Sequence, residues 1–596
     1  MRPESFEQAL SYAVKQAINL GYSDKADIAF RENIFRKLPD RIIRPIGQQY
    51  QSTYKKLGRR DANLMLLDID SKLTKETIRL SSSDDDLVQY AKLRAKACSR
   101  IRAQYSTLKK AYDAICCVVR RFDLEPIKLG RKFSLTGAVG RMSDDTWWRR
   151  ALRKKHKRNT ESLAIQLGLV CKQKGIYASD EAVNTRKEQK IRANQMLEEM
   201  EAVNELDQSY TLKELQDLSV SNPAIRRAEL MTRIAGFEEY AQNIGHVGEF
   251  YTFTCPSRMH ARMSISGDQN PKYDGMTPDK SQTYLNKQWS KIRSALDRSD
   301  IHIYGMRVAE PQHDATPHWH LLVFMQPEHV EIVRETMRRY SLEVDGDEKG
   351  AKKHRFTALA IDWSKGTAAG YIAKYISKNI DAHGVDKDLF GNNAKKSAIR
   401  VDAWASNWGI RQFQQIGGPS VTIWRILRNL KEIPEDGIAK LAYEAADNGD
   451  WCQYMEIMGG HTATGKDWPI GLAKEEVDKL NQYGEPIGQV IVGITLGSLT
   501  YRSKVHTWTI RLKSEDNDIY TGFDSVNVTL RNVTENYSVT ENNSLQESRT
   551  GNNRSLYIDD LYIDTDLEHL DKNQEKLDAD LDGSRKNDKF NKKGPE

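Results

Sequence analysis

The spacing of apolar residues changes along the chain, and the change occurs near residue 248. Before that point apolar residues recur every three or four positions, which is typical of helices. Within Asp86–Val119, for example, this spacing predicts one buried helix face, formed by Leu87, Tyr90, Leu93, Ala97 and Ile101. We therefore expect residues 1–125 to be mostly helical, with further helices over 186–204 and 223–243.

Beyond residue 248 apolar and polar residues alternate, as they do in strands. The strands predicted in this way are Phe250–Thr254, Ile301–Val308 and His318–Phe324, and helical spacing returns over 280–298, 327–340 and 366–380. This β-α-β-β-α-β-like order is typical of an α+β domain whose antiparallel sheet is flanked by helices. The predicted fold class is therefore α+β, with a mostly helical N-terminal region ahead of the sheet.

Further changes of pattern divide the chain into segments. A Trp-rich stretch covers 401–432, and strands are predicted near 489–495 and 505–511. After about residue 513 polar residues dominate, so we expect this tail to be largely disordered. The predicted segments are a helical region 1–130, a basic helical region 131–245, the α+β domain 246–385, a Trp-rich extension 386–435, a small mixed α/β segment 436–512 and the polar tail 513–596.

Composition narrows the class of protein. The chain has 596 residues, of which 39% are hydrophobic, enough for several packed cores. No apolar run approaches the roughly 20 residues that span a bilayer, and the first ten residues lack the apolar segment of a secretory signal. The six Cys form no C-x-x-C pair, which argues against a zinc knuckle or a disulfide scaffold. We expect a soluble cytoplasmic protein with no membrane partner.

The segment His318-Trp319-His320 carries the first candidate chemistry. Side chains alternate between the faces of a strand, so His318 and His320 point the same way, about 7 Å apart along the strand. Two imidazoles on one face can hold a divalent ion. The alternative interpretation is a pair of hydrogen-bonded histidines near the end of a strand.

A third ligand is predicted if the strands on either side of Asp314 pair as a hairpin. Glu310 then lies opposite His318 on the same face, and two imidazoles with one carboxylate suit Mg²⁺ or Mn²⁺. A slip of one residue would turn Glu310 away, and His313 and Asp314 would then be the substitutes. The remaining alternative is that Glu310 is a surface charge at the end of a strand.

A predicted helix about fifty residues further on carries two tyrosines and two lysines. Tyr371 and Tyr375 are four residues apart and share a face, and Lys374 and Lys378 form a row beside them. A phenol can attack a phosphodiester while an ammonium offsets the phosphate charge. The alternative is a pair of tyrosines at the edge of the core, but this helix after an H-x-H strand in a basic chain is a much rarer combination than either piece.

These residues resemble the HUH endonucleases, in which U is a hydrophobic residue. More closely, they resemble the bacteriophage replication gene A protein family of rolling-circle initiators. Three motifs match in order, namely Phe250–Arg258, Glu310–Asp314 with Thr316–His320, and Tyr371–Asn379. The flanking segments that also resemble the family are Trp147–Arg150, Ser221–Arg227 and Asp402–Gly418. The resemblance covers roughly residues 140–430.

The resemblance implies an RRM-like or ferredoxin-like nuclease domain with a metal-dependent, two-tyrosine mechanism. Glu310, His318 and His320 would hold Mg²⁺ or Mn²⁺. Tyr371 or Tyr375 would attack single-stranded or supercoiled origin DNA, giving a 5′-phosphotyrosyl link and a free 3′-OH. Lys374 and Lys378 are the other catalytic candidates. The implied partners are a host helicase and the replication machinery, in the cytoplasm of a bacterial host. The rival functions are an HUH relaxase or transposase and a non-catalytic DNA-binding regulator.

The net charge of +7 is too small to indicate a nucleic-acid partner by itself, but basic residues are concentrated in Trp147–Arg158. Phosphate contacts combined with stacking suit single-stranded DNA. The predicted DNA-binding residues are Trp147, Trp148, Arg149, Arg150, Arg153, Lys154 and Lys155. The alternative is a solvated helix face. A second basic and aromatic cluster contains Arg400, Trp404, Trp408, Arg411 and Phe413, where core packing of the Trp residues is an equal expectation.

One segment imitates a nucleotide-binding loop. Residues 460–466 fit the first seven positions of a Walker A motif, but Asp467 stands where a Ser or Thr would bind magnesium. We therefore expect no P-loop ATPase in this chain, and DNA unwinding would need a partner helicase.

Overall fold

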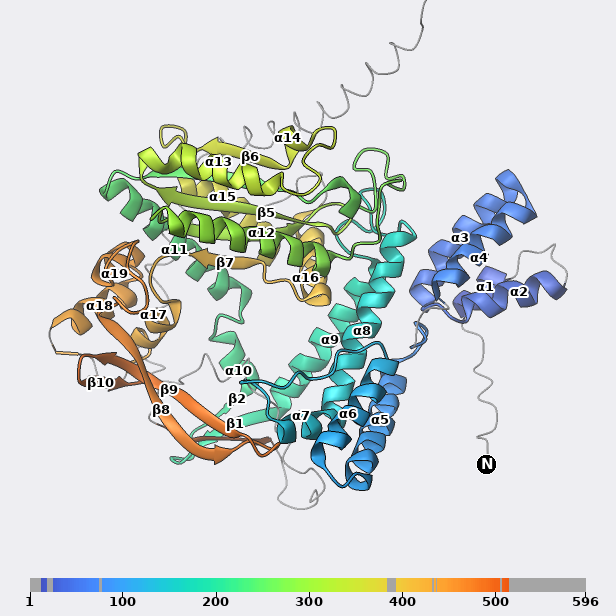
Figure 1. Ribbon diagram of the computed structural model, residues 1–596, viewed down its shortest axis with the longest axis horizontal. Coiled ribbons are helices and arrows are strands. Elements are labelled where there is room, and N and C mark those ends of the chain that lie inside the picture. Colours follow the sequence, from blue (N-terminus) through green and yellow to red (C-terminus); the bar gives the residue numbers. More distant parts are fainter. Residues whose placement is uncertain are drawn as a thin grey trace, which may run out of the picture. The chain divides into compact units, whose positions relative to one another are not determined.

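The computed structural model describes residues 12–18, 25–73, 78–382, 393–430, 434–435, 437–503 and 506–513. The chain forms two compact units, one of residues 1–184 with 476–489 and one of residues 185–475 with 490–596. Each is considered by itself (Figure 1). The polar tail expected to be disordered lies, from residue 514 onward, outside the described residues. No helix in the described part of the chain combines the length and apolarity needed to cross a membrane.

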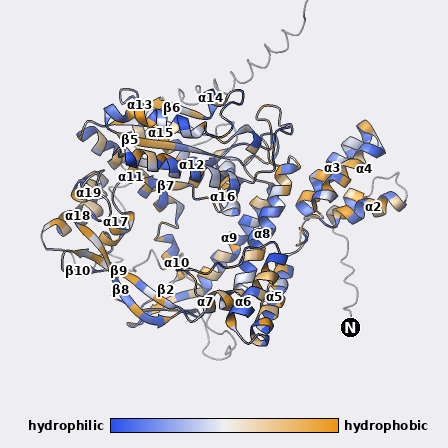
Figure 2. Cartoon of the chain, in the orientation of Figure 1, coloured by the Kyte–Doolittle hydropathy of each residue, from blue (hydrophilic) through white to orange (hydrophobic). Residues whose placement is uncertain are grey.

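The first unit is helical, in agreement with the spacing of its apolar residues. Its helices are α1 (Tyr12–Ile18), α2 (Lys25–Phe35), α3 (Asp40–Leu57), α4 (Arg59–Leu73), α5 (Asp84–Gln104), α6 (Leu108–Arg121), α7 (Leu135–Met142) and α8 (Asp145–Gln166), followed by the start of α9 (Asp180–Glu199). Blue and orange residues alternate around α3 and α4 in Figure 2, as expected for amphipathic helices. Ser83 and Thr107 cap α5 and α6 by accepting hydrogen bonds from Asp86 N and Lys110 N.

The buried face of α5 differs from the prediction. The side chains of Tyr90 and Leu93 are 40% and 56% exposed, whereas Ala91 and Cys98 are fully buried. α5 packs against both α6 and α8, which turns a row of small residues inward. Apolar spacing identified the helix but not the phase of its contact face.

The first unit also contains the end of a long hairpin, residues 476–489. The backbone N and the hydroxyl of Ser134 each donate a hydrogen bond of 2.9 Å to Glu485, just ahead of α7. Arg141, in the last turn of α7, pairs with the same carboxylate at 2.7 Å. Glu485 therefore holds both ends of this short helix.

The second unit is organised around a five-stranded antiparallel sheet in the order β6-β3-β5-β4-β7. Its strands are β3 (Val247–Phe253), β4 (Tyr304–Pro311), β5 (Pro317–Met325), β6 (Phe356–Ala360) and β7 (Phe413–Ile416). Helix α12 (Pro278–Arg298) joins β3 to β4, and α13 (Val330–Ser341) joins β5 to β6. The predicted β-α-β-β-α-β order is thereby confirmed. No residue range was predicted for β6, the last strand of that order, or for the edge strand β7, because both are short and mostly only half-buried.

Alternation along the strands gives this sheet two covered faces. Leu322 and Phe324 pack with Phe250 against α11 (Pro223–Asn243) and α15 (Ala368–Ile380). On the opposite face the Trp319 indole donates a hydrogen bond of 3.0 Å to Gln282 of α12. In Figure 1 these helices lie on the two sides of the sheet. Residues that share a face with Leu322 therefore point toward α11 and α15.

Close contact between β4 and β5 depends on Gly305. Its φ is 146°, and a Cβ at this position would lie 2.1 Å from the carbonyl oxygen of Leu322. Only glycine adopts this backbone conformation without strain and leaves room for the neighbouring strand. Gly305 thus favours the pairing of β4 with β5 that brings the predicted metal donors together.

The helix expected over 186–204 ends earlier than predicted. α9 stops at Glu199, and the chain continues as β1 (Met200–Asn204), which pairs with β2 (Ser209–Thr211) on one side and β11 (Trp508–Leu512) on the other. Pairing with a strand some 300 residues away overrides the local helical spacing.

The remaining elements are α10 (Leu212–Asp217), α14 (Ala351–His354), α16 (Ala394–Trp408), α17 (Val421–Leu427), α18 (Gly437–Asn448), α19 (Trp451–Ile457), β8 (Ile470–Leu480), β9 (Pro486–Leu496), β10 (Leu499–Arg502) and the 3₁₀ turns η1 (Ser257–Met259) and η2 (Pro327–His329).

Candidate metal and nucleophile site

The pairing of β4 and β5 has the register predicted from the sequence. Glu310 lies opposite His318, and Val308 lies opposite His320. The predicted hairpin register is therefore confirmed, and the one-residue slip is excluded. Because all three polar side chains fall on the same face of the sheet, they point toward α11 and α15.

The two imidazoles and the carboxylate converge on one point. His318 Nε2 lies 2.9 Å from His320 Nε2, and each lies 3.7 Å from Glu310 Oε2. Glu310 is fully buried and the His320 side chain is 3% exposed. We call these three residues the donor group. Among the described residues they are the group of three or more His, Cys, Asp or Glu side chains whose ligand atoms all lie within 4.8 Å of one another.

The electrostatics of these residues suit a divalent cation. Burial, with a smaller contribution from Lys378 and His260, lowers the pKa of His318 to about 3, and burial with His318 and Lys378 lowers that of His320 well below its usual value. Both rings are therefore neutral near pH 7, the form that binds metals. Glu310 Oε2 is buried and accepts no hydrogen bond, although the Lys378 ammonium lies 3.5 Å away. The residues present thus fit a metal with nitrogen and oxygen ligands.

Two further residues orient these donors, and neither was among the candidate site residues predicted from the sequence. Thr252 Oγ1 lies 3.0 Å from His320 Nδ1, so that His320 Nε2 is left facing the donor group. Asn379 Nδ2 donates to Glu310 Oε1 and to the carbonyl oxygen of Tyr375. Both lie within the motifs that resemble the phage family. Thr252 is directly opposite His320 on β3, and Asn379 is one turn after Tyr375.

The tyrosine helix α15 packs over the donor group. The Tyr375 ring centroid lies 4.3 Å from that of His320, and the Tyr375 side chain is buried. Lys378 is buried and faces Glu310, as noted above. Tyr371 and Lys374 lie one turn earlier and are partly exposed. The structure therefore brings Tyr375 and Lys378 to the donor group, while Tyr371 and Lys374, in the preceding turn, remain partly exposed.

The alternative third ligands, His313 and Asp314, are used in the hairpin turn. Asp314 accepts hydrogen bonds from Thr316 N at 3.1 Å and from Arg262 N at 3.4 Å, and contacts His260 Nδ1 at 3.3 Å. Although burial opposes it, the charges of His260 and His313 hold the pKa of Asp314 well below its usual range. Neither His313 nor Asp314 belongs to the donor group found among the described residues.

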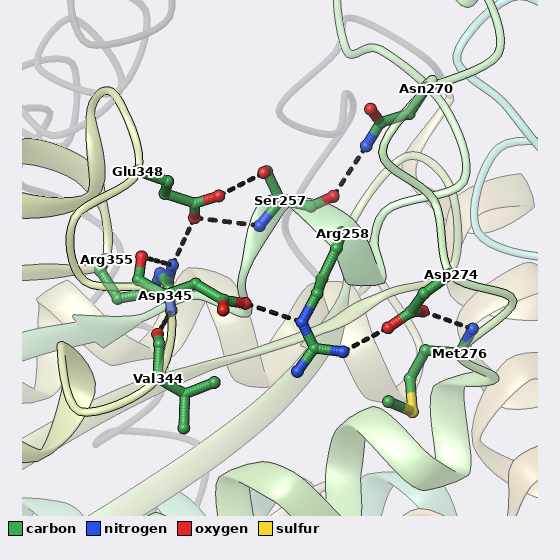
Figure 3. Close-up of polar contacts among 9 residues, drawn as sticks. All are labelled: Ser257, Arg258, Asn270, Asp274, Met276, Val344, Asp345, Glu348 and Arg355. Carbon is green, nitrogen blue, oxygen red and sulfur yellow. Dashed lines mark hydrogen bonds and ion pairs between the residues drawn. The ribbon is translucent and has the colours of Figure 1, made fainter.

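The loop that carries His260 is itself tied down by a polar network (Figure 3). Glu348 accepts hydrogen bonds from the backbone N and hydroxyl of Ser257 and from Arg355. Arg258 Nε donates to Asp345 at 2.7 Å. These contacts join the loop after β3 to the segment before β6, and they hold His260 against the turn between Glu310 and His318.

The predicted DNA-binding residues lie on α8 in the first unit. Trp148 is completely buried, and its indole donates to Met142 O at 2.9 Å, so this side chain packs the core and is removed from the set proposed to contact DNA. Arg153 is paired with Asp84 and Lys155 with Asp123, each with a shortest N–O distance of 2.5 Å. Trp147 and Arg149 are half-buried, and Arg150 and Lys154 are exposed.

In the second aromatic cluster the core interpretation holds for Trp404 and Trp408. Both side chains are buried, and the Trp404 indole donates a hydrogen bond of 2.8 Å to Ala315 O in the hairpin turn. Trp404 therefore supports the turn that separates Glu310 from His318. Arg411 is exposed.

Comparison with known proteins shows similarity to phage replication proteins. Residues 87–383 match the family model of the bacteriophage replication gene A protein (GPA). The chain is 43% identical over 390 residues to the probable replication protein P12 of Pseudoalteromonas phage PM2, covering 63% of this chain and 60% of that protein. It is 40% identical over 447 residues to the replication gene A protein of Escherichia phage 186, covering 72% and 62% of the two chains.

A third relative is named for its activity. The chain is 34% identical over 366 residues to the probable replication endonuclease from a prophage-like region of Salmonella paratyphi A, covering 58% of this chain and 46% of that protein. The chain thus spans about half to three fifths of the length of these relatives. No solved structure gives a significant match.

Proposed function

Because residues 87–383 place the chain in the bacteriophage replication gene A protein family, we propose that it is a replication initiator that nicks single-stranded origin DNA through a tyrosine. The observation that carries the proposal is the convergence of Glu310, His318 and His320 directly beneath a helix bearing two tyrosines. A relative named as a probable replication endonuclease supports an enzymatic rather than a purely binding role.

The proposal extends to an HUH-type endonuclease. His318-Trp319-His320 would be the H-U-H element, with Trp319 packed into the opposite face of the sheet. The strand order β6-β3-β5-β4 within the β-α-β-β-α-β unit supports a ferredoxin-like arrangement. Glu310, His318 and His320 would hold Mg²⁺ or Mn²⁺, which when bound would polarise the scissile phosphate.

The protein's own residues would carry out the transfer. The phenol of Tyr371 or Tyr375 loses its proton and attacks the phosphorus, so that an Oη–P bond forms and the P–O3′ bond breaks. The 3′ oxygen takes up a proton and leaves as a free 3′-OH, while the 5′ side stays linked to the tyrosine. Lys374 and Lys378 would offset the charge on the phosphate.

A second tyrosine gives the protein a second transfer. One phenol would hold the first 5′ end while the other cuts the newly copied junction, and reversal of the reaction would join the displaced strand. The phosphotyrosyl bond conserves the energy of the phosphodiester, so rejoining needs no ATP. Unwinding of the duplex would fall to a host helicase, and the polymerase that extends the 3′-OH would come from the host cytoplasm.

Covalent trapping tests this function. Labelled single-stranded oligonucleotides with Mn²⁺ should give a protein–DNA adduct that survives a denaturing gel, and EDTA should prevent it. Tyr371→Phe with Tyr375→Phe should abolish the adduct but leave DNA binding intact, because phenylalanine keeps the ring packing and removes the nucleophile. An adduct of wild-type yield in the double variant would exclude both tyrosines.

The same experiment separates the rival functions. A non-catalytic DNA-binding regulator would bind the oligonucleotide and give no adduct under any metal condition. A relaxase or transposase would share the chemistry but differ in substrate. Nicking of a phage replication origin, with joining of the displaced strand, would favour the initiator over these enzymes.

A further inference from the structure

Helices α11 and α15 pack against each other in opposite directions, and charged residues connect them at both ends of α15. Glu238, in the last third of α11, reaches the first turn of α15. Arg227, near the start of α11, reaches Asp381, just after the last residue of α15. The charge that α11 supplies is therefore negative at the start of α15 and positive at its end.

At the first end, Glu238 caps the tyrosine helix from outside it. Its two carboxylate oxygens accept hydrogen bonds from Ala368 N at 2.6 Å and Ala369 N at 2.9 Å, and Thr367 accepts one from Gly370 N at 3.0 Å. Glu238 is buried, so its negative charge acts at close range on the positive end of the helix dipole. These contacts satisfy three backbone donors that the buried helix end would otherwise leave without partners.

At the second end, Arg227 pairs with Asp381, the C-cap residue of α15. The Arg227 side chain is 9% exposed, and a cation at the C-terminus of a helix is favoured by the dipole. Because the Arg227 guanidinium is buried, a break in this pair is costly for Arg227, whose charge would lose its partner. Both ends of α15 are therefore held by one neighbouring helix.

The spacing of the two contacts fixes the position of α15 along its axis. Arg227 and Glu238 are eleven residues apart, about 17 Å along α11 at 1.5 Å per residue. Ala369 and Asp381 are twelve residues apart, about 18 Å along α15. A slide of α15 by one residue would break both contacts, and it would turn Tyr375 away from His320.

We propose that Arg227 and Glu238 are positioning residues that set the tyrosine helix in register with the metal donors, and so determine which phenol reaches the scissile phosphate. This inference rests on the proposed function for its consequence, but the register itself is a property of the protein without DNA. A displacement of about 1 Å in a reacting group can lower a rate by about 100-fold.

A charge-reversal cycle tests the contact at the C-terminal end. The variants are Arg227→Glu, Asp381→Arg and the two together, with Mn²⁺ as the metal and a single-stranded oligonucleotide as the substrate. Each single variant should lower the rate of adduct formation by about 10- to 100-fold and change the share of adduct on Tyr371 and Tyr375, measured by peptide mass spectrometry. The double variant should recover most of both, because the pair is restored in reverse.

A milder variant tests the other end. Glu238→Gln keeps the shape of the side chain but points an NH₂ group at one of the two backbone N–H groups. It should change the share of adduct between the tyrosines while the affinity for Mn²⁺ stays within about twofold of wild type. Glu239→Gln is the matched control, because Glu239 is the next residue of α11 and is exposed. If Arg227→Glu does not fold, Glu238→Gln decides the matter alone.

A measurement without DNA separates this inference from the proposed function. A fluorotyrosine placed at 371 or 375 reports its distance from bound Mn²⁺ through broadening of its ¹⁹F resonance. In Glu238→Gln the ratio of broadening at the two positions should change. An unchanged ratio, or a charge-reversed double variant no better than its parents, would overturn the positioning role. If the wild-type protein forms no adduct, the proposed function is overturned. If the broadening ratio nevertheless changes in Glu238→Gln, the positioning role stays supported.

Discussion

At the scale of single residues, Glu310 is the most constrained side chain in the candidate site. It is fully buried, one oxygen accepts a hydrogen bond from Asn379, and the other faces both imidazoles and the Lys378 ammonium. A buried carboxylate is stable in such a place only when cationic groups or a metal compensate its charge. With both rings neutral, Lys378 and a bound cation would share that task.

Glu310→Gln should therefore weaken metal binding while leaving the hairpin in place. The amide has nearly the same shape but no charge, so the affinity for Mn²⁺ should fall. The expected loss is at least about tenfold, because even the loss of a residue that only supports a metal ligand typically lowers metal affinity by about 10- to 100-fold. Titration followed by electron paramagnetic resonance measures it directly. Glu335→Gln, on the exposed face of α13, is the control and should bind Mn²⁺ as the wild type does. Equal affinities in the two variants would exclude Glu310 as a metal ligand.

At the scale of elements, two helices depend on charged side chains that come from elsewhere in the chain. Glu238 caps α15 from α11, and Glu485 caps α7 from the turn of the long hairpin. Burial opposes ionisation of Glu485, but hydrogen bonds from Ser134 and Arg141 outweigh it and lower its pKa from 4.5 to about 2. The short helix α7 is therefore stabilised most when this carboxylate is charged.

The contribution of Glu485 should depend on pH in a definite direction. Because the folded pKa lies below the unfolded one, the stabilisation is complete above about pH 4.5 and is lost as the pH falls toward 2. The difference in thermal midpoint between wild type and Glu485→Gln should thus be largest near pH 7 and shrink below pH 4.5. Glu476→Gln, exposed on strand β8 of the same hairpin, should show no such trend. A difference that stays constant down to pH 3 would mean that the charge of Glu485 is not what stabilises α7.

At the scale of the whole molecule, the two kinds of candidate chemistry lie in different units. The metal donors and tyrosines belong to the second unit, and the basic helix α8 belongs to the first. On α8 the cations differ in their surroundings, since Arg153 and Lys155 are held in ion pairs, Lys154 is exposed and Arg149 is half-buried. DNA affinity and metal affinity should accordingly respond to different substitutions.

Arg149→Ala with Lys154→Ala should weaken binding of single-stranded DNA and leave Mn²⁺ affinity unchanged. Each lost phosphate contact lowers the slope of log affinity against log salt by roughly 0.7 for a single strand. Fluorescence anisotropy between 50 and 300 mM salt measures that slope. Arg153→Ala is the comparison on the same helix, and its effect should be smaller because Asp84 already competes for the guanidinium. A slope identical to wild type in the double variant would indicate that α8 is a solvated face.

The sequence alone determined those features that depend on short-range periodicity. Alternation and hairpin geometry were sufficient to place Glu310 opposite His318, and helical spacing was sufficient to locate α11, α12, α13 and α15 to within a few residues. These features are local, because the residues that create each pattern are neighbours in the chain.

The tertiary structure alone decided which residues support the site and which side chains are available. Asn379 reaches Glu310 across 69 residues, and Glu238 reaches Ala368 across 130. Trp148 lies in a predicted DNA-binding run but is buried by α8's own neighbours, and β1 forms within a predicted helix because it pairs with β11. No periodic pattern encodes such contacts, because each depends on the packing of elements that are distant in the sequence and on the burial that this packing creates.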